Sequence, residues 1–136
     1  MEKTFHLNIL TPYGHYFEGA VEFLEVHSEK YNLGIFPGHA PLISTLEVGK
    51  MIIRIKEINE IYAIGGGIIN IEKDKVILVL NSIERHDEID LERAKDAKKR
   101  AEDRLNESKN DDAIDVNRAK LALLRAINRI NIGSRD

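Results

Sequence analysis

The residue types most often used in catalysis and metal binding are present, but they form no known catalytic or metal-binding motif. The five histidines occur without an HExxH motif and without carboxylates at ligand spacing, so we expect no metal site. No serine has the sequence context of a nucleophile elbow. The run Gly65-Gly66-Gly67 precedes a strand-like segment and no Gly-Lys-Ser/Thr follows it, which predicts a sheet bulge or close backbone approach and not a phosphate loop. The sequence therefore predicts a chain that is not itself an enzyme and requires no cofactor.

Composition narrows the class of protein further. The 136 residues are 43% hydrophobic and 32% charged, with a net charge of −3 and no cysteine. The absence of cysteine excludes disulfides, thiolate metal sites and a cysteine nucleophile, and suits a reducing compartment. The net negative charge argues against nucleic-acid binding. We also expect no secretory signal and no membrane span, because no apolar stretch is long enough.

The chain changes character near residue 85. All three prolines, all eight aromatics and eight of the nine glycines lie at or before Gly67. From His86 onward, 24 of 51 residues are charged, against 19 of 85 before it. This shift predicts an all-β sandwich over residues 1–85 followed by an α-helical hairpin over 86–136, an α+β chain overall.

Short apolar segments bounded by turn residues fill the first part. We expect strands near 5–10, 21–26, within 32–38, and at 42–46, 50–56, 61–64, 67–71 and 76–81. Residues 11–14 and 73–75 are expected to be turns. Strands this short and this closely spaced are typical of a sandwich or barrel.

Two helices are expected at about Asp90–Leu105 and Asp115–Ile132. The segment from Ile89 to Lys95 reappears in similar form 25 residues later, and each aspartate is placed to cap a helix N-terminus. The first helix offers a thin stripe of alanines, whereas the second has a wide apolar face. An alanine stripe buries little area, so we expect the hairpin to need a further partner.

A distinctive segment, Gly34-Ile-Phe-Pro-Gly-His-Ala-Pro-Leu42, predicts a rigid turn because it holds two prolines and two glycines. Together with the Ala63–Gly67 run, the Ser82-Ile-Glu-Arg85 segment and the C-terminal hairpin, it resembles the ε subunit of bacterial F-type ATP synthase. The resemblance extends from about Lys3 to Ile132.

The resemblance implies a non-catalytic rotor subunit of the central stalk, peripheral to the cytoplasmic face of the bacterial inner membrane. The sandwich would bind the γ subunit and the c ring of a proton- or sodium-driven motor. The hairpin would either fold back or extend toward the catalytic α/β hexamer and inhibit ATP hydrolysis. An element with two packings of similar energy can act as such a switch.

A regulatory ATP site is implied by the same resemblance. Part of the family binds ATP through an I/L-D-x-x-R-A motif and arginines of the second helix. The matching residues in this chain are Glu84, Ile89, Asp90, Arg93, Ala94, Arg100, Arg125 and Arg129. Converging guanidinium groups recognise phosphate oxygens, and Asp90 could accept from an adenine amino group or only cap its helix. The similar segment at Ile114–Ala119 indicates that the motif also serves as a capping device.

The sequence departs from the family at one loop, where many relatives have Gly-Glu-Leu/Ile-Gly near the c ring. Tyr31 and Asn32 occupy the first two positions, so an acidic ring contact is not expected there. A different class of function also remains open: a free-standing β-sandwich ligand-binding module with a helical dimerisation hairpin. Co-purification with γ would separate the two hypotheses.

Overall fold

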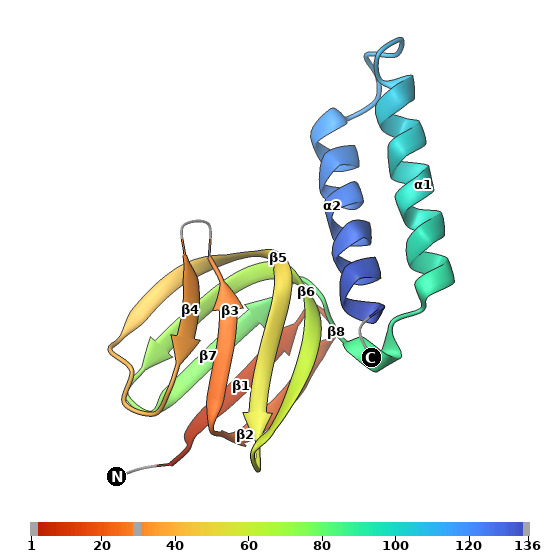
Figure 1. Ribbon diagram of the computed structural model, residues 1–136. Helices are drawn as coiled ribbons and strands as arrows, with labels where there is room; N and C mark the ends of the chain where they lie inside the picture. Colours follow the sequence, from red (N-terminus) through yellow and green to blue (C-terminus); the bar gives the residue numbers. More distant parts are fainter. Residues whose placement is uncertain (1–2, 29–30, 135–136) are drawn as a thin grey trace. The chain divides into compact units, whose positions relative to one another are not determined.

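The computed structural model describes residues 3–28 and 31–134. The chain divides into two compact units, Met1–Arg85 and His86–Asp136. The first is an eight-stranded β unit and the second a two-helix hairpin (Figure 1). The predicted α+β fold class, a β-sandwich followed by a helical hairpin, is confirmed.

The first unit contains the strands β1 (Phe5–Thr11), β2 (Gly14–Val21), β3 (Phe23–His27), β4 (Asn32–Ile35), β5 (Leu42–Ile55), β6 (Ile58–Glu72), β7 (Lys75–Leu80) and β8 (Ile83–Arg85). They follow the order β2-β1-β7-β6-β5-β3-β4, with β8 added to β6. Neighbouring strands are antiparallel except β1 and β7, which are parallel.

The two longest strands join the layers of the sandwich. The second half of β6 pairs with β7, and its first half pairs with β8. The sequence predicted four short segments here, but β5 and β6 each run unbroken through both layers. A second difference is β2, which was not expected as a strand because its exposed positions mix polar and apolar residues, from Gly14 and His15 to Tyr16, Glu18 and Ala20, and so show no clean alternation.

The glycine run lies where β6 passes from one layer to the other. Gly66 has φ +90°, and a Cβ there would lie 3.0 Å from the carbonyl oxygen of Leu46. At Gly67 a side chain would collide with the backbone of Val79 and Leu80. The prediction of a close backbone approach at this run is therefore confirmed.

The core lies wholly within the first unit. Alternate residues of facing strands point inward, as the period of two requires, and Leu7, Ile9, Leu24, Ile69 and Leu78 are fully buried. The Pro37–Pro41 connection forms a tight turn in which the backbone N–H of His39 donates to Phe36 O at 3.2 Å. Gly38 adopts φ +84° there, which a side chain would disfavour.

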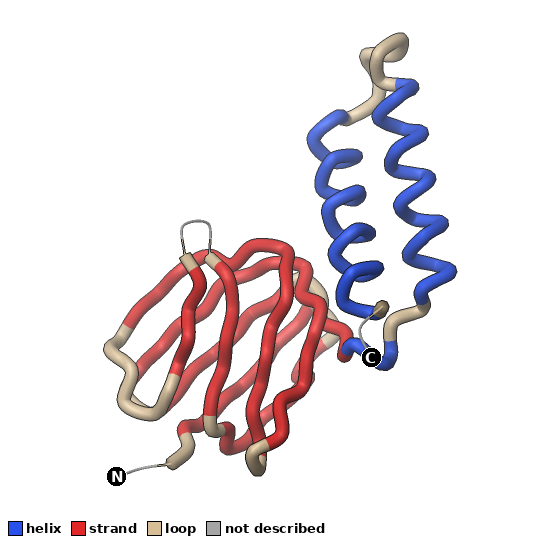
Figure 2. Tube along the Cα trace, viewed as in Figure 1, coloured by secondary structure: helices blue, strands red, loops and turns tan. Residues whose placement is uncertain are grey.

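The second unit consists of η1 (His86–Glu88), α1 (Leu91–Glu107) and α2 (Val116–Gly133). The two helices run antiparallel, side by side (Figure 2). The two helices pack against each other along a seam of alanines. The buried members of this seam are Ala94, Ala101, Ala119 and Ala126.

Candidate functional site

The first turn of α1 contains three of the predicted site residues, Asp90, Arg93 and Ala94. Asp90 caps the helix: its Oδ1 accepts from the backbone N–H of Arg93 at 3.0 Å. Its carbonyl oxygen accepts from the N–H of Ala94, also at 3.0 Å. This geometry satisfies helix N–H groups that would otherwise lack partners. Asp90 therefore has a structural role, and its adenine contact stays a prediction.

Ile89 and Ala94 have packing roles. The side chain of Ile89 lies against the end of α2, where a Cβ on Gly133 would come within 3.0 Å of Ile89 Cγ2 and of Leu91 Cδ2. Ala94 is fully buried in the helix seam. A larger residue in place of Ala94 or of Gly133 would push the two helices apart.

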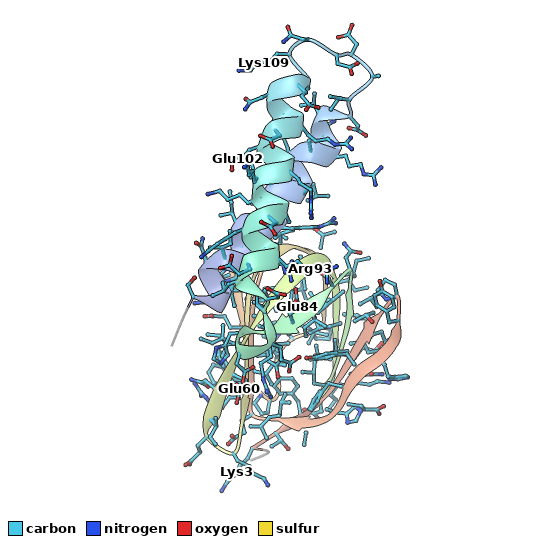
Figure 3. The ribbon with its side chains drawn as sticks, turned by 90° about the vertical axis from the view of Figure 1, so that its right-hand side faces the viewer. Lys3, Glu60, Glu84, Arg93, Glu102 and Lys109 are labelled. Carbon is cyan, nitrogen blue, oxygen red and sulfur yellow. The ribbon has the colours of Figure 1, made fainter. Side chains whose placement is uncertain are left out.

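The four predicted arginines lie on both helices. Arg93 and Arg100 are exposed on α1, Arg125 is exposed on α2, and Arg129 is half-buried there. Figure 3 shows Arg93 near the start of α1, with Glu102 further along the helix and Lys109 beyond its end. Spacings of seven and four keep the arginines of each helix on one flank. We name Asp90, Arg93, Arg125 and Arg129 the proximal set.

A groove opens between the helices toward the interhelical loop, and we name it the distal groove. It has a volume of about 460 Å³, within the usual range of ligand sites. Arg100 is the predicted site residue that lines it, together with Arg104, Arg118 and Asp115. The remaining lining residues are small: Ala97, Ala101, Ala113, Ala119 and Ala122.

The sequence did not predict Arg104 or Arg118 as ligand-site residues: Arg118 was expected to face an acidic surface of the hexamer, and Arg104 was not considered. Their spacing carried the signal, because Arg104 lies four residues after Arg100 and Arg118 is the arginine of the second copy of the motif, Ile114–Ala119. Within residues 3–28 and 31–134, no carboxylate lies within ion-pair distance of Arg100, Arg104 or Arg118.

Glu84 belongs to the sandwich unit. It lies on β8, opposite Ala63 of β6, and is half-buried. Its neighbours around a hollow of about 350 Å³ include Tyr13, His15 and Tyr16. The structure thus places Glu84 with sandwich residues, while the other seven predicted residues lie in the hairpin unit.

Asn32 opens β4 and hydrogen-bonds through Oδ1 with Nδ1 of its cross-strand partner His27. Ser28 and Tyr31 close the same connection, since the N–H of Ser28 donates to Tyr31 O at 2.9 Å. Tyr31 is exposed. Of the segment that departs from the family pattern, Tyr31 precedes β4 and Asn32 begins it, and contacts within the chain fix both.

Two other kinds of feature are missing from the described part of the chain. Among those residues, no group of three or more His, Asp or Glu side chains is placed to hold a metal ion. No helix among them is long and apolar enough to span a membrane.

Both units match family models. Residues 4–86 match the β-sandwich domain of the ATP synthase delta/epsilon chain, and residues 87–133 match its long α-helix domain. The fold and these matches define a two-domain subunit of an ATP synthase. The chain belongs to the ATP synthase delta/epsilon chain family.

Individual relatives agree. The chain is 41% identical over 104 residues to the ATP synthase epsilon chain of Bacillus velezensis, covering 76% of this chain and 79% of that one. The epsilon chain of Priestia megaterium is also 41% identical, with coverage of 76% and 78%. The resemblance to the ε subunit drawn from the sequence is thereby confirmed, and these relatives are subunits of an enzyme complex.

Solved structures support the fold. A chain in the cryo-EM structure of the Euglena gracilis mitochondrial ATP synthase, OSCP/F1/c-ring, matches with a TM-score of 0.80 at 17% identity, covering 94% of this chain and 80% of that chain. A chain in the Tetrahymena thermophila central stalk/c-ring structure matches with a TM-score of 0.54 at 16% identity, with coverage of 62% and 68%.

Proposed function

We propose that this chain is the non-catalytic rotor subunit of a bacterial F-type ATP synthase, at the cytoplasmic face of the inner membrane. Its sandwich binds γ and the c ring of a proton- or sodium-translocating motor. Its hairpin restrains ATP hydrolysis by contacting the α/β hexamer. The match of both domains to one family carries the proposal, and the central-stalk and F1/c-ring structures of its fold neighbours support it.

An exposed apolar area on the sandwich suits the contact with γ. Ile68 and Val79 are direct cross-strand partners on β6 and β7, and both side chains are about half exposed. Ile43 on β5 is 72% exposed on the same face. Nearby, Asn8 Oδ1 is buried and has no hydrogen-bond partner among the described residues. A partner that covers this face would bury the apolar side chains and could donate to Asn8.

The test of this contact is recovery of γ. The double variant Ile68→Glu/Val79→Glu should lose γ in a pull-down while its circular dichroism stays unchanged, because both side chains point outward. Ile58→Glu is the control, since Ile58 is exposed at the β5–β6 turn. Wild-type chain that recovers no γ would favour the free-standing module and contradict the rotor assignment.

The hairpin leaves an apolar surface on α2. Leu121, Leu124 and Ile127 are all at least one-third exposed although they are large apolar residues. A surface of this kind needs a second partner, and the α/β hexamer would supply it when the hairpin opens. Removing residues 87–136 should therefore raise ATP hydrolysis by the assembled enzyme without disrupting assembly. Equal hydrolysis by the truncated and full-length complexes would contradict the inhibitory role.

ATP is the regulatory ligand we propose for the hairpin, at the proximal set with Glu84, Ile89, Ala94 and Arg100. Clustered guanidinium groups repel one another, and a triphosphate would offset that repulsion through charge-assisted hydrogen bonds. The ligand can favour the folded hairpin only by its higher affinity for that form. Without a catalytic base, the nucleotide would be released unchanged.

Calorimetry on the full chain tests ATP binding. Arg93→Ala and Arg125→Ala should each weaken binding, because each removes a guanidinium group from the phosphates. Lys95→Ala is a matched control. It removes one cation from the first turns of α1, and the Lys95 side chain points away from Arg93. Binding that is undetectable at millimolar ATP, or equal in all variants, would contradict this site.

A further inference from the structure

The helical hairpin contains an internal duplication that extends well beyond the capping motif. When residues 87–106 are compared with residues 112–131, eleven of the twenty positions are identical. The identical pairs are Asp87/Asp112, Ile89/Ile114, Asp90/Asp115, Arg93/Arg118, Ala94/Ala119, Lys95/Lys120, Ala97/Ala122, Arg100/Arg125, Ala101/Ala126, Arg104/Arg129 and Asn106/Asn131.

The structure repeats where the sequence does. Asp90 and Asp115 cap their helices with nearly equal backbone angles, φ −80° and ψ 99° against φ −76° and ψ 100°. Their Oδ1 atoms accept from the N–H of the arginine three residues later, at 3.0 and 3.1 Å. The four buried alanines of the seam are two repeat-related pairs.

Two antiparallel helices with equivalent sequences are related by an approximate twofold axis between them. This axis exchanges Arg93 with Arg118, Arg100 with Arg125, and Arg104 with Arg129. It therefore carries the distal groove onto the proximal set: Asp115, Arg118 and Arg104 correspond to Asp90, Arg93 and Arg129.

The positions that differ between the two copies lie on other faces. Lys98, Lys99 and Glu102 of α1 correspond to Leu123, Leu124 and Ile127 of α2. Thus the copies share the alanine seam and the arginine flank, and they differ where α2 presents its apolar surface.

The charge of the distal groove favours an anion. Three arginines and one aspartate line it, and within the described chain the arginines have no ion-pair partner. Arg118 lies in the first turn of α2, which contains no acidic residue. The Asp115 carboxylate already caps that end of the helix, so the preference for an anion rests on the three arginines, which outnumber the one carboxylate of the groove.

We propose that the distal groove is a second oligophosphate-binding site, a pseudosymmetric copy of the proximal set, so that one chain binds two anions. The charge and shape of the groove carry the site itself. The choice of a nucleoside triphosphate as its ligand rests on the proposed function, because it is transferred from the proximal set by the repeat.

Calorimetry of the full chain with ATP and, separately, with inorganic tripolyphosphate tests the stoichiometry. We expect two ATP per chain. Arg104→Ala/Arg118→Ala should remove one event or weaken it more than tenfold, and Arg93→Ala/Arg129→Ala should remove only the other. If tripolyphosphate fills the distal groove as well as ATP does, the groove recognises phosphates alone. If only ATP fills it, the base contributes too, and both results support the oligophosphate site.

Lys95→Ala/Lys120→Ala is the matched control. These lysines are another repeat-related pair of cations. Lys95 lies two positions after Arg93 and Lys120 two positions after Arg118, so each faces away from that arginine. The control removes the same net charge and should keep both binding events. The methyl groups of Ala113 and Ala122 provide a second readout by NMR, because both line the distal groove and neither belongs to the proximal set.

The outcomes separate the two proposals. One ATP per chain, abolished by Arg93→Ala/Arg129→Ala and unaffected by Arg104→Ala/Arg118→Ala, would overturn the distal site and leave the proximal one standing. Binding that depends only on Arg104 and Arg118 would support the distal site and contradict the proximal one. No binding of either anion, or equal losses in the lysine control, would overturn the distal site.

Discussion

The sandwich and the hairpin differ in the amount of apolar surface that each buries within itself. The sandwich core consists of large aliphatic side chains from both layers. The hairpin buries four alanines along its seam and Ile132 at its end. Because stabilisation scales with apolar area, at roughly 25 cal/mol per Å², the sandwich is a self-sufficient unit and the hairpin is weakly held. The two units therefore differ in how much of their stability each can supply from its own core.

The largest effect should come from the sandwich core. Leu78→Ala removes a fully buried side chain and should lower the free energy of unfolding by about 2–5 kcal/mol. Val79→Ala changes the next residue, which lies on the outer face, and should lower the free energy of unfolding far less. Denaturant titration of both variants measures the difference, and equal losses would show that the sandwich does not rely on this core.

The next largest effect is expected at the alanine seam of the hairpin. Ala101→Leu places a large side chain where Ala101 is 5% exposed, and overpacking should destabilise the hairpin by about 1–3 kcal/mol. Far-UV circular dichroism should show earlier loss of helix, while the tyrosine signal of the sandwich is unchanged. Ala122→Leu is the control at an exposed position of the same hairpin. A common transition for both signals would mean that the two units unfold together.

A smaller effect is expected at the helix caps. Asp115→Ala removes the hydrogen bond to the N–H of Arg118 and should cost about 1 kcal/mol of helix stability. Asp112→Ala removes the same charge without removing that cap. Thermal melting of the helical signal distinguishes the variants, and identical melting curves would indicate that charge alone matters.

The smallest change is expected when the hairpin is removed altogether. A chain ending at Arg85 keeps every residue of the sandwich core, so its unfolding midpoint should stay close to that of the sandwich in the full chain. Differential scanning calorimetry of both chains makes the comparison. A truncated chain that does not fold would refute the separation of the two units.

The sequence was most informative where one residue type has one physical use. Asp90 and Asp115 predicted the helix starts because few residues can satisfy free N–H groups there. Gly66 and Gly67 predicted close backbone contact for a similar reason. By contrast, β2 was missed, since the exposed positions of Gly14–Val21 mix polar and apolar residues and show no clean alternation. Strand propensity depends on the neighbours that a strand finds, which no local pattern contains.

The candidate site was only partly accessible from the sequence. The motif located Asp90 and Arg93, and helical spacing placed Arg100, Arg125 and Arg129 on matching flanks. The distal groove could not be foreseen, because it depends on how closely the alanine seam draws two helices together and on which flank stays open. Arg104 and Arg118 come to line one groove only through that geometry.

The parallel pairing of β1 with β7 has a consequence for how the protein folds while it is synthesised on the ribosome. His6 lies beside Lys75, so β1 cannot complete its pairing until β7 has been made (Figure 1). At translation rates of about 5–20 residues per second, that interval lasts several seconds. Pairing between distant segments is also slow in itself, whereas the hairpin forms from near neighbours and folds quickly. The hairpin, which is synthesised last, can therefore fold almost as soon as it is made. The sandwich can complete its fold only after β7 has been synthesised.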